Sequence, residues 1–355
     1  MKKPKIIKLI DYVFQNKGQL AEAHDDSNTM NYLGEFFDIE VIGRLNIPSI
    51  CTSMAYSDDG SVYDVTFFPA EASTSDMINY IFAQNPDIIH MHGNHGWPRF
   101  QVFASHFSDW LTDTKLVFSP AGTSCGTEAF LGCFDKVIVN HGLQVTRMRC
   151  EPEKVVVRKR TADPLVFYPD HSPTPVFDFV YVAGFVPQKR IDLMIDMIKE
   201  TEYSLAILGD FSRTEEHYKQ ICFHISRKGL DKQVSLIDFI PQTKMSDFLG
   251  TCKVWVWPNI KPENPETTTN RSVIEALACG MPMLVGERAF RNTGFIQPGY
   301  NGYLYSDQGS FERYANVLMD FYEVFGDNSH KLYKDVYGFQ ENFVDFYKNF
   351  YNSLL

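Results

Sequence analysis

The chain has 355 residues, which is more than one ordinary core needs and suits two domains of moderate size. Hydrophobic residues make up 44% and aromatic residues 14%, so the composition excludes a disordered protein. The net charge of -11 argues against a general nucleic-acid binder, because neutralising phosphates requires a basic surface.

Seven scattered cysteines form no close pair, which predicts reduced thiols and a cytoplasmic protein. No apolar run reaches the roughly 18–20 residues of a membrane span, and no signal-peptide cleavage site follows the basic start. Peripheral association with a membrane remains open. Lys2, Lys3, Lys5 and Lys8 fit either contact with an anionic surface or a solubilising edge, and the second interpretation is favoured.

Short apolar runs alternate with helical patterns along the whole chain, which is typical of parallel-sheet α/β domains. In the first half we predict strands at 6–9, 37–42, 87–90, 116–118 and 136–139, with a helix at 75–84. In the second half we predict strands at 179–182, 205–208, 234–237, 254–257 and 283–285, with a helix at 190–198.

A proline-rich segment at 163–176 separates the halves and predicts a hinge, because proline continues neither a helix nor a sheet. The pattern therefore predicts two doubly wound domains in series. Ligands of such sheets bind at the carboxyl ends of the strands, so we expect a cleft between the two domains.

The first informative motif is VYVAGFVPQKRIDLMI, in which a strand ends near Gly184 and a helix opens near Lys189. A helix N-terminus offers free N–H groups and partial positive charge, which suit a phosphate. Lys189 and Arg190 oppose the helix dipole there, and a bound anion would offset them. Two solvated cations on a surface turn are the alternative.

The second motif is PENPETTTNRSVIEALACGMPMLVG, which predicts a polar loop and then a short helix. Ser272 to Ile274 lead into this helix, so Glu275 should lie at its start. A carboxylate there is suited to accepting two vicinal ribose hydroxyls. The alternative is that Glu275 only complements the helix dipole.

These motifs resemble those of the retaining GT-B glycosyltransferases that use nucleotide sugars, the group 1 or family 4-like enzymes. The matching stretches run in the family's order over most of residues 179–305, and E-A-x-A-x-G-x-P at 275–282 is the most specific. The resemblance implies the GT-B fold, with two Rossmann-like domains facing each other across a cleft. It implies an acceptor-binding domain at 1–165, a nucleotide-sugar-binding domain at 176–330, and a helix at 331–355 that crosses back onto the first domain.

The same resemblance implies roles for single residues. Lys189 should contact the donor diphosphate, Glu275 the ribose, and Phe239 and Ile240 should flank the base. The donor-binding set it implies comprises Gly184, Lys189, Arg190, Phe239, Ile240, Thr267, Asn270, Arg271, Ser272 and Glu275. Glu266 should lie near the transferred sugar as a catalytic residue.

The sequence departs from the family at three positions. Phe185 replaces a basic residue after the glycine of the first turn, and Arg190 or Arg271 would have to supply that charge. Thr267 occupies the usual acidic position, so Glu266 serves only if the loop bulges by one residue. Retention of configuration depends on that bulge. Ala121 stands where a histidine often follows the proline.

In the first half, PDIIHMHGNHGWP resembles the family's strand with an H-x-H pair. We expect His90 to be a hydrogen-bonded core residue. His92, on the following loop, is the predicted catalytic residue facing the acceptor. A metal site formed with His95 is the disfavoured alternative, because a carboxylate at suitable spacing is missing. The acceptor side further includes Gly18, Gly122, Thr123 and Ser124.

The predicted reaction transfers a hexosyl or pentosyl group from a nucleoside-diphosphate sugar, with UDP or GDP favoured, to an acceptor hydroxyl. The resemblance implies a metal-independent enzyme with no cofactor. A saccharide or lipid-linked acceptor is the default, and the acidic balance disfavours a modified DNA base. The alternative is a non-catalytic nucleotide-sugar or glycan-binding module that kept the GT-B fold.

Overall fold

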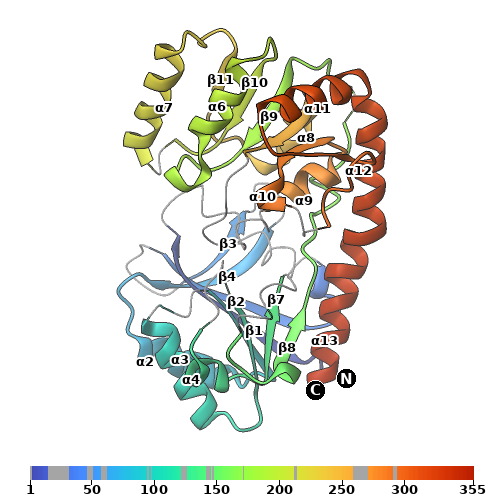
Figure 1. Ribbon diagram of the computed structural model, residues 1–355. Helices are drawn as coiled ribbons and strands as arrows, with labels where there is room; N and C mark the ends of the chain where they lie inside the picture. Colours follow the sequence, from blue (N-terminus) through green and yellow to red (C-terminus); the bar gives the residue numbers. More distant parts are fainter. Residues whose placement is uncertain are drawn as a thin grey trace. The chain divides into compact units, whose positions relative to one another are not determined.

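The computed structural model describes residues 2–14, 32–45, 51–56, 62–93, 96, 98–120, 126–140, 145, 148–170, 172–211, 214–258, 271–290 and 294–355. The chain divides into two compact units (Figure 1). The first contains residues 1–160 together with 340–355, and the second contains residues 161–339. Each unit is built on its own parallel α/β sheet.

The sheet of the first unit has the strand order β3-β4-β2-β1-β5-β6-β7-β8. Its strands are β1 (Lys5–Phe14), β2 (Asp38–Leu45), β3 (Cys51–Tyr56), β4 (Val62–Pro69), β5 (Ile88–Gly93), β6 (Lys115–Pro120), β7 (Lys136–Val139) and β8 (Val155–Val157). All pairings are parallel except that between β3 and β4. The five predicted strands of this half are confirmed, whereas β3, β4 and β8 were missed. β3 and β8 are the two edge strands and β4 lies next to β3, where strands need not be continuous apolar runs.

Alternation along the strands gives this sheet two different faces. Ile7, Leu9, Ile89 and Met91 belong to an apolar core shared with Phe103 and its neighbours. The helices are α2 (Thr74–Gln84), α3 (Pro98–Trp110), α4 (Glu128–Gly132) and the 3-10 helix η2 (Pro152–Lys154). Helix α2 confirms the predicted helix: the Ser73 side chain caps its start and left-handed Asn85 ends it.

The other face of this sheet packs against the C-terminal segment, which comprises η7 (Gln340–Asp345) and α13 (Phe346–Leu354). His90 is 1% exposed, and its Nδ1 lies 2.7 Å from the Tyr351 hydroxyl. The Tyr347 ring lies 6.0 Å from the Lys8 ammonium and 5.3 Å from the Arg158 guanidinium. We call Lys8, His90, Arg158, Tyr347 and Tyr351 the helix-docking cluster. Figure 1 shows α13 beside β8.

The helix-docking cluster corrects the interpretation of the N-terminal lysines. Lys8 is 2% exposed, so it touches neither an anionic surface nor solvent. Lys5 forms an ion pair with Glu40 at 3.5 Å. Lys3 donates a hydrogen bond to the Gly34 carbonyl at 2.8 Å. Strand β1 thus buries Lys8 and half-buries Lys5, whereas Lys2 and Lys3 before the strand are exposed, as a solubilising edge would be.

The second unit has a six-stranded sheet with the order β11-β10-β9-β12-β13-β14 and only parallel pairings. Its strands are β9 (Phe177–Val182), β10 (Leu205–Leu208), β11 (Val234–Ile237), β12 (Cys252–Trp257), β13 (Met283–Gly286) and β14 (Gly302–Tyr305). The five predicted strands are confirmed. The edge strand β14 was not predicted as a strand.

Helices cover this sheet. They are the 3-10 helices η3 (Pro187–Lys189) and η5 (Gln242–Lys244), and α6 (Ile191–Lys199), α7 (Glu215–Arg227), α8 (Met245–Gly250), α9 (Arg271–Ala278), α10 (Glu287–Phe290), α11 (Gln308–Asp320) and α12 (Tyr322–Tyr337). Gly280 ends α9 with φ +70, and Met281 N–H bonds to the Ala276 carbonyl as in a Schellman motif. A Cβ at Gly326 would meet the Gly280 carbonyl oxygen at 2.5 Å, so α12 lies close against this helix end.

The boundary between the units lies between Arg160 and Thr161, before the predicted hinge. Val166 and Phe167 of the proline-rich segment are buried in the core of the second unit. Ser246 Oγ donates to the Val166 carbonyl at 2.6 Å. These contacts make the segment part of the second unit. Helix α12 also belongs to the second unit, and only residues 340–355 join the first, whereas residues 331–355 were expected to do so.

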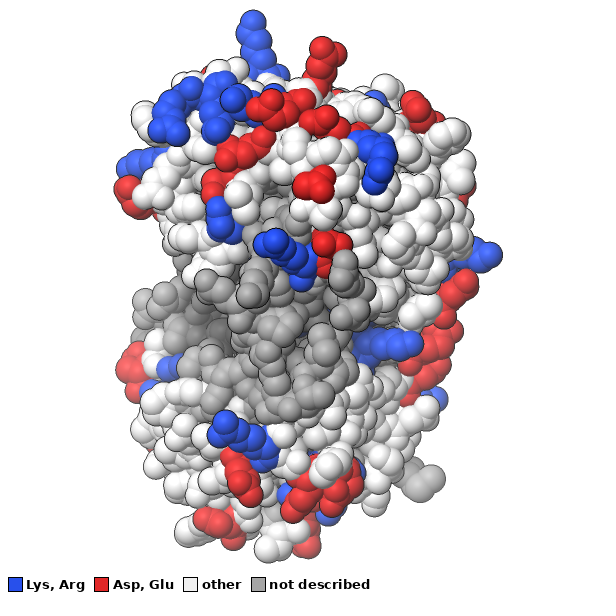
Figure 2. Space-filling model, in the orientation of Figure 1, with Lys and Arg blue, Asp and Glu red and all other residues white. Residues whose placement is uncertain are grey.

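Two general features of the described residues bear on function. None of the helices in the described ranges has the length and apolar character needed to cross a membrane. On the face drawn in Figure 2, basic side chains are interspersed with acidic ones and build no uniformly basic stretch among the described residues.

Candidate functional site

The sheet of the second unit reverses its direction of winding at β9. The chain passes from β9 to β10 and β11 on one side, then returns to the other side of β9 as β12. Ligands of open parallel sheets bind at the carboxyl ends of the strands at such a reversal. The site is therefore expected where β9 and β12 end, at Val182 and Trp257.

The turn after β9 begins at Gly184. A Cβ at this position would meet nothing within 4 Å, so the packing of the protein itself does not require glycine. The next residue, Phe185, is fully buried and lies 4.7 Å from Phe211 and 5.8 Å from Tyr218, measured between ring centroids. Phe185 is thus a core residue where the family resemblance places a basic one, and the charge at this turn must come from elsewhere.

Lys189 ends the 3-10 helix η3 and turns toward the end of β12. Its Nζ lies 5.0 Å from the centroid of the Trp257 ring. Its backbone carbonyl accepts a hydrogen bond of 2.6 Å from the Tyr181 hydroxyl. Burial lowers the pKa of Lys189 from 10.5 to about 8. The structure therefore holds a desolvated cation at the reversal point of the sheet, which is a suitable place for an anion.

Arg190 follows in the left-handed conformation, with φ 48, and directs its side chain to a different partner. Its guanidinium forms an ion pair of 2.8 Å with Asp192. This hydrogen bond raises the pKa of Arg190; burial would raise that of Asp192, but the Arg190 bond lowers it. The two neighbouring side chains thus point to different groups. The Lys189 ammonium lies over an aromatic ring, and the Arg190 guanidinium pairs with a carboxylate.

Phe239 and Ile240 follow the edge strand β11. Phe239 is 37% exposed, and Ile240 is half-buried. The Phe239 N–H donates to the carboxylate of Asp238 at 2.7 Å, which fixes the start of this segment. Both residues lie at the carboxyl edge of the sheet, and their place beside the base stays a prediction.

Helix α9 links the parallel neighbours β12 and β13, so its first residue lies at the same carboxyl edge. Arg271 and Ser272 open the helix and are half-buried. Glu275 lies in the second turn, not at the start as predicted, because the helix begins at Arg271, four residues before Glu275. Its side chain is 7% exposed. The buried apolar positions from Val273 to Ala278 hold the helix rigidly behind this edge.

In the first unit, the winding reverses between β1 and β5. His92 lies within β5, opposite Ile10 and Ser119 of the neighbouring strands, and not on a loop as predicted. It is half-buried on the same face as His90.

His90 is a core residue, as predicted. Its ring nitrogens lie 2.7 Å from the hydroxyls of Tyr351 and Ser119. Burial, with the charges of Lys8, His92 and Arg158, lowers the pKa of His90 well below 6.5, so the ring is neutral.

Several predicted site residues lie outside the described part of the chain. They are Glu266, Thr267 and Asn270 on the donor side, Gly18, Gly122, Thr123 and Ser124 on the acceptor side, and the alternative metal ligand His95. The segments containing Gly18 and Gly122 follow β1 and β6 in the chain, and both strands pair with β5, the strand of His92. Their assignments stay predictions.

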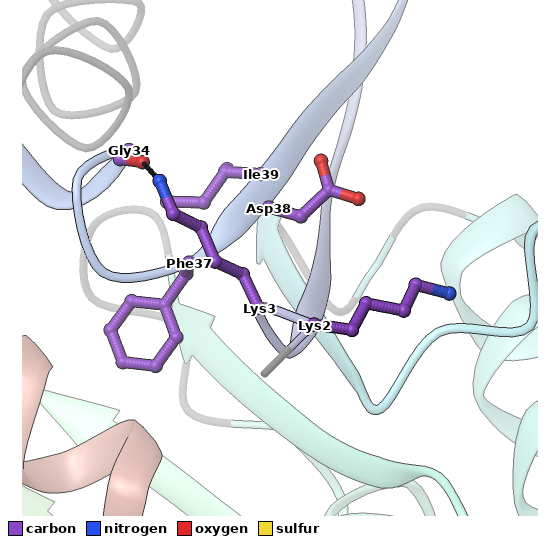
Figure 3. A pocket seen from close by; sticks show the side chains of 6 residues that line it. All are labelled: Lys2, Lys3, Gly34, Phe37, Asp38 and Ile39. Atoms are coloured by element: carbon purple, nitrogen blue, oxygen red, sulfur yellow. Dashed lines mark hydrogen bonds between the residues drawn. The ribbon is translucent and has the colours of Figure 1, made fainter.

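Two other kinds of site, a metal centre and a pocket in the first unit, do not fit the ligand-binding edge of the sheets. Among the described residues, no three or more His, Cys, Asp or Glu side chains are grouped to hold a metal ion. An open pocket of about 470 Å³ is lined by Lys2, Lys3, Gly34, Phe37, Asp38 and Ile39. Figure 3 shows Lys3 turned to the Gly34 carbonyl and Lys2 extending away from it. This pocket lies at the amino ends of β1 and β2, opposite to the edge where such sheets bind ligands.

The sequence did not point to the aromatic residues around Lys189. Trp257 is 1% exposed and its ring lies 5.2 Å from that of Tyr181, edge to face. The Tyr305 hydroxyl donates to the Trp257 carbonyl at 3.0 Å. The sequence VWVW, at the carboxyl end of a predicted strand, could have pointed to these residues. Two tryptophans are unusually large side chains for the core of a parallel sheet.

The chain is thus a two-unit α/β protein in which Lys189 lies at the carboxyl edge of the second sheet. Residues 170–334 match the family model of the group 1 glycosyl transferases. This match covers most of the second unit, and the whole chain has the GT-B fold of solved glycosyltransferases.

One curated relative is similar to part of the chain. The chain is 26% identical over 125 residues to the uncharacterized glycosyltransferase MJ1178 of Methanocaldococcus jannaschii. That match covers 35% of this chain and 32% of the relative, so it spans about a third of each.

Two solved structures share the fold across the whole chain. Sucrose-phosphate synthase of Thermosynechococcus elongatus is 11% identical and superposes with a TM-score of 0.74, covering 99% of both chains. Anabaena Alr3699/HepE, solved in complex with UDP and glucose, is 14% identical with a TM-score of 0.68 and covers 99% of this chain and 98% of its own. At such identities the likeness shows the GT-B fold.

Proposed function

We propose that the protein transfers a sugar from a nucleoside-diphosphate sugar, UDP- or GDP-linked, to an acceptor hydroxyl, and that the second unit binds the donor. The observation that carries the proposal is Lys189, a half-buried cation at the point where the sheet reverses its winding. A diphosphate is the anion such a site accommodates well, because two charge-bearing groups face one cation and a helix N-terminus.

The roles proposed for the other donor residues follow from their positions. The N-terminus of α9, with Arg271 and Ser272, would receive phosphate oxygens. Glu275 would accept the ribose hydroxyls, and the exposed ring of Phe239 would lie against the base. Gly184, Arg190, Ile240, Thr267 and Asn270 would complete the donor contacts.

Departure of the diphosphate leaves positive charge on the sugar ring, so the protein must stabilise the leaving group and position the acceptor. Lys189 would neutralise the developing phosphate charge without a metal ion. Glu266 would lie near the sugar and His92 would orient the acceptor, a saccharide or lipid-linked hydroxyl, together with Gly18 and the Gly122–Ser124 segment. We further propose that configuration is retained.

A thermal-shift screen against nucleoside diphosphates and their sugars tests the donor site. A ligand at 100 times its dissociation constant stabilises the folded state by about 2.7 kcal/mol. We expect one donor to stabilise the protein and Glu275→Ala to lose the effect. The exposed Glu216→Ala of α7 is the matched control and should respond as the wild type does. No stabilisation by any nucleotide would refute the proposal.

A second assay tests transfer itself. An enzyme should slowly release free sugar from its cognate donor when water replaces the acceptor, and a chelator should leave this rate unchanged. Binding without any release would instead identify a nucleotide-sugar-binding module. Loss of release with a chelator would refute the metal-independent mechanism.

A further inference from the structure

One carboxylate joins the two loops that follow β10 and β11 at the carboxyl edge of the second sheet. Asp238 comes directly after β11, and its Oδ1 accepts a hydrogen bond of 2.7 Å from the Phe239 N–H. The same oxygen accepts a longer hydrogen bond, of 3.4 Å, from the N–H of Phe211, which follows β10 in the chain. Because β10 and β11 are paired neighbours, these two contacts fix the carboxylate between the ends of both strands.

Aromatic side chains line the same edge of the sheet. The rings of Phe211 and Tyr218 are stacked, with centroids 4.3 Å apart, and both side chains are half-buried. Phe185, which follows β9, packs edge-on against Phe211 at 4.7 Å. Phe239, next to the carboxylate, is 37% exposed. The carboxylate is thus a single polar group on an apolar edge, which is the composition of a pocket for a flat, mostly apolar ligand.

The charge of Asp238 is fixed in place but is not neutralised. Its side chain is exposed, and among the described residues it forms no ion pair with a lysine, arginine or histidine. Asp192 of α6, by contrast, pairs with Arg190 at 2.8 Å. A carboxylate has about four lone-pair sites. The two backbone bonds occupy Oδ1, so Oδ2 can accept hydrogen bonds from a ligand.

The position of Asp238 fits the base of a nucleotide whose phosphates lie where the sheet reverses its winding. Neighbouring strands of a sheet lie about 4.8 Å apart. β11 is two strands away from β9, so Asp238 lies on the order of 10 Å to the side of the turn that carries Lys189. In a nucleotide the ribose separates the base from the phosphates, and it bridges a span of this size.

A carboxylate distinguishes bases by the hydrogen-bond donors that they present. Guanine has two adjacent donors, the N1–H and the 2-amino group, whereas uracil has a single N–H between two carbonyl oxygens. A carboxylate, which only accepts, attracts the guanine edge and repels the oxygens of uracil. A site built to bind such donors also rejects an analogue that lacks them, because its own polar group is then left unpaired.

We propose that Asp238 selects guanine, so that the donor is a GDP-linked sugar. The proposal rests on the proposed function, in which the base lies beside Phe239, and it decides between the two nucleotides named there. The rings of Phe211 and Phe239 provide apolar faces for the base, and Asp238 accepts hydrogen bonds from its edge. Asp238 is therefore a specificity-determining residue of the donor site.

Isothermal titration calorimetry of the wild-type protein with GDP, UDP and inosine diphosphate tests the proposal without a variant. We expect GDP to bind about 10- to 100-fold more tightly than UDP, which is the range of hydrogen bonds to a charged group. Inosine diphosphate, which lacks only the 2-amino group of GDP, should bind more weakly than GDP. UDP or inosine diphosphate binding as tightly as GDP would overturn the inference and leave the donor site intact. A protein that binds neither GDP nor UDP would overturn the proposed function as well.

Asp238→Asn exchanges the hydrogen-bonding groups and preserves the loops. Its amide oxygen can still accept the backbone N–H groups, while an NH2 donor replaces Oδ2. We expect GDP to bind this variant about 10- to 100-fold more weakly. Xanthosine diphosphate, in which a carbonyl replaces the 2-amino group, should bind it more tightly than it binds the wild type.

A purely structural role of Asp238 would not exchange one base for another. Asp231→Asn is the matched control, because Asp231 is also exposed and precedes β11 at the opposite edge of the sheet. It should change the affinity for GDP less than about 2-fold. An equal loss in the two variants, or a loss in Asp238→Asn without any gain for xanthosine diphosphate, would overturn the inference.

Discussion

Replacing Lys189 by methionine should stabilise the unliganded protein while removing nucleotide binding. Burial lowers the pKa of this lysine from 10.5 to about 8, which means that the fold disfavours its charged form. A shift of about 2.5 units at about 1.4 kcal/mol per unit sets a ceiling near 3.4 kcal/mol at neutral pH. The attraction to Trp257, about 1–2 kcal/mol, is lost in the variant and reduces the gain. We expect a net stabilisation of about 1–3 kcal/mol.

The pH dependence gives the sign of the effect. Below about pH 8 the lysine is charged in both the folded and the unfolded state, so the full penalty applies. Between that pH and 10.5 the folded state releases its proton first, and above 10.5 both states are neutral and the penalty is absent. The advantage of Lys189→Met should therefore be largest at neutral pH and decline as the pH rises.

Urea unfolding at about pH 7 and about pH 9.5 measures this advantage, with the exposed Lys219→Met of α7 as the control. Methionine preserves most of the apolar stem, so loss of packing is small. A destabilised Lys189→Met at neutral pH, or a gain that stays constant with pH, would refute the assignment of Lys189 as a desolvated cation.

Two further predictions concern the supports of the fold. Tyr351→Phe removes the hydroxyl that lies 2.7 Å from Nδ1 of the buried His90. We expect it to lower the free energy of unfolding, measured by urea titration, by about 1–3 kcal/mol. A loss under about 0.5 kcal/mol would contradict this prediction. Gly326→Ala places a Cβ 2.5 Å from the Gly280 carbonyl oxygen and should destabilise by about 1–3 kcal/mol. In Gly309→Ala of α11 the nearest neighbour of the new Cβ would be the carboxylate of the N-cap Asp307, 3.7 Å away, so this variant should be neutral or stabilising. Equal melting temperatures for the two variants would argue against the close approach of α12 to the end of α9.

Much of the fold followed from the sequence because interior parallel strands are continuous apolar runs. All ten predicted strands exist, and the four missed strands, β3, β4, β8 and β14, lie at or beside sheet edges, where the hydrophobic pattern is weaker. The antiparallel pairing of β3 with β4 carries no local signal of its own.

The candidate site was predictable where it depends on a turn and a helix start. The turn at Gly184 and Lys189 was predicted because its motif is local in the chain, and the roles of these residues and of Glu275 stay predictions. The contact of Trp257 with Lys189 was not predicted, because β10 and β11 lie between η3 and β12 in the sequence. The core role of Phe185 likewise depends on Phe211, which reaches it only in the folded unit.

The order of the elements also constrains how the protein is made. Residues 340–355 follow the entire second unit along the chain, yet they complete the first. During synthesis, the second unit is finished while Lys8, His90 and Arg158 still lack the aromatic rings of Tyr347 and Tyr351. The first unit is therefore synthesised first, but its packing can be completed only after the whole second unit has been synthesised.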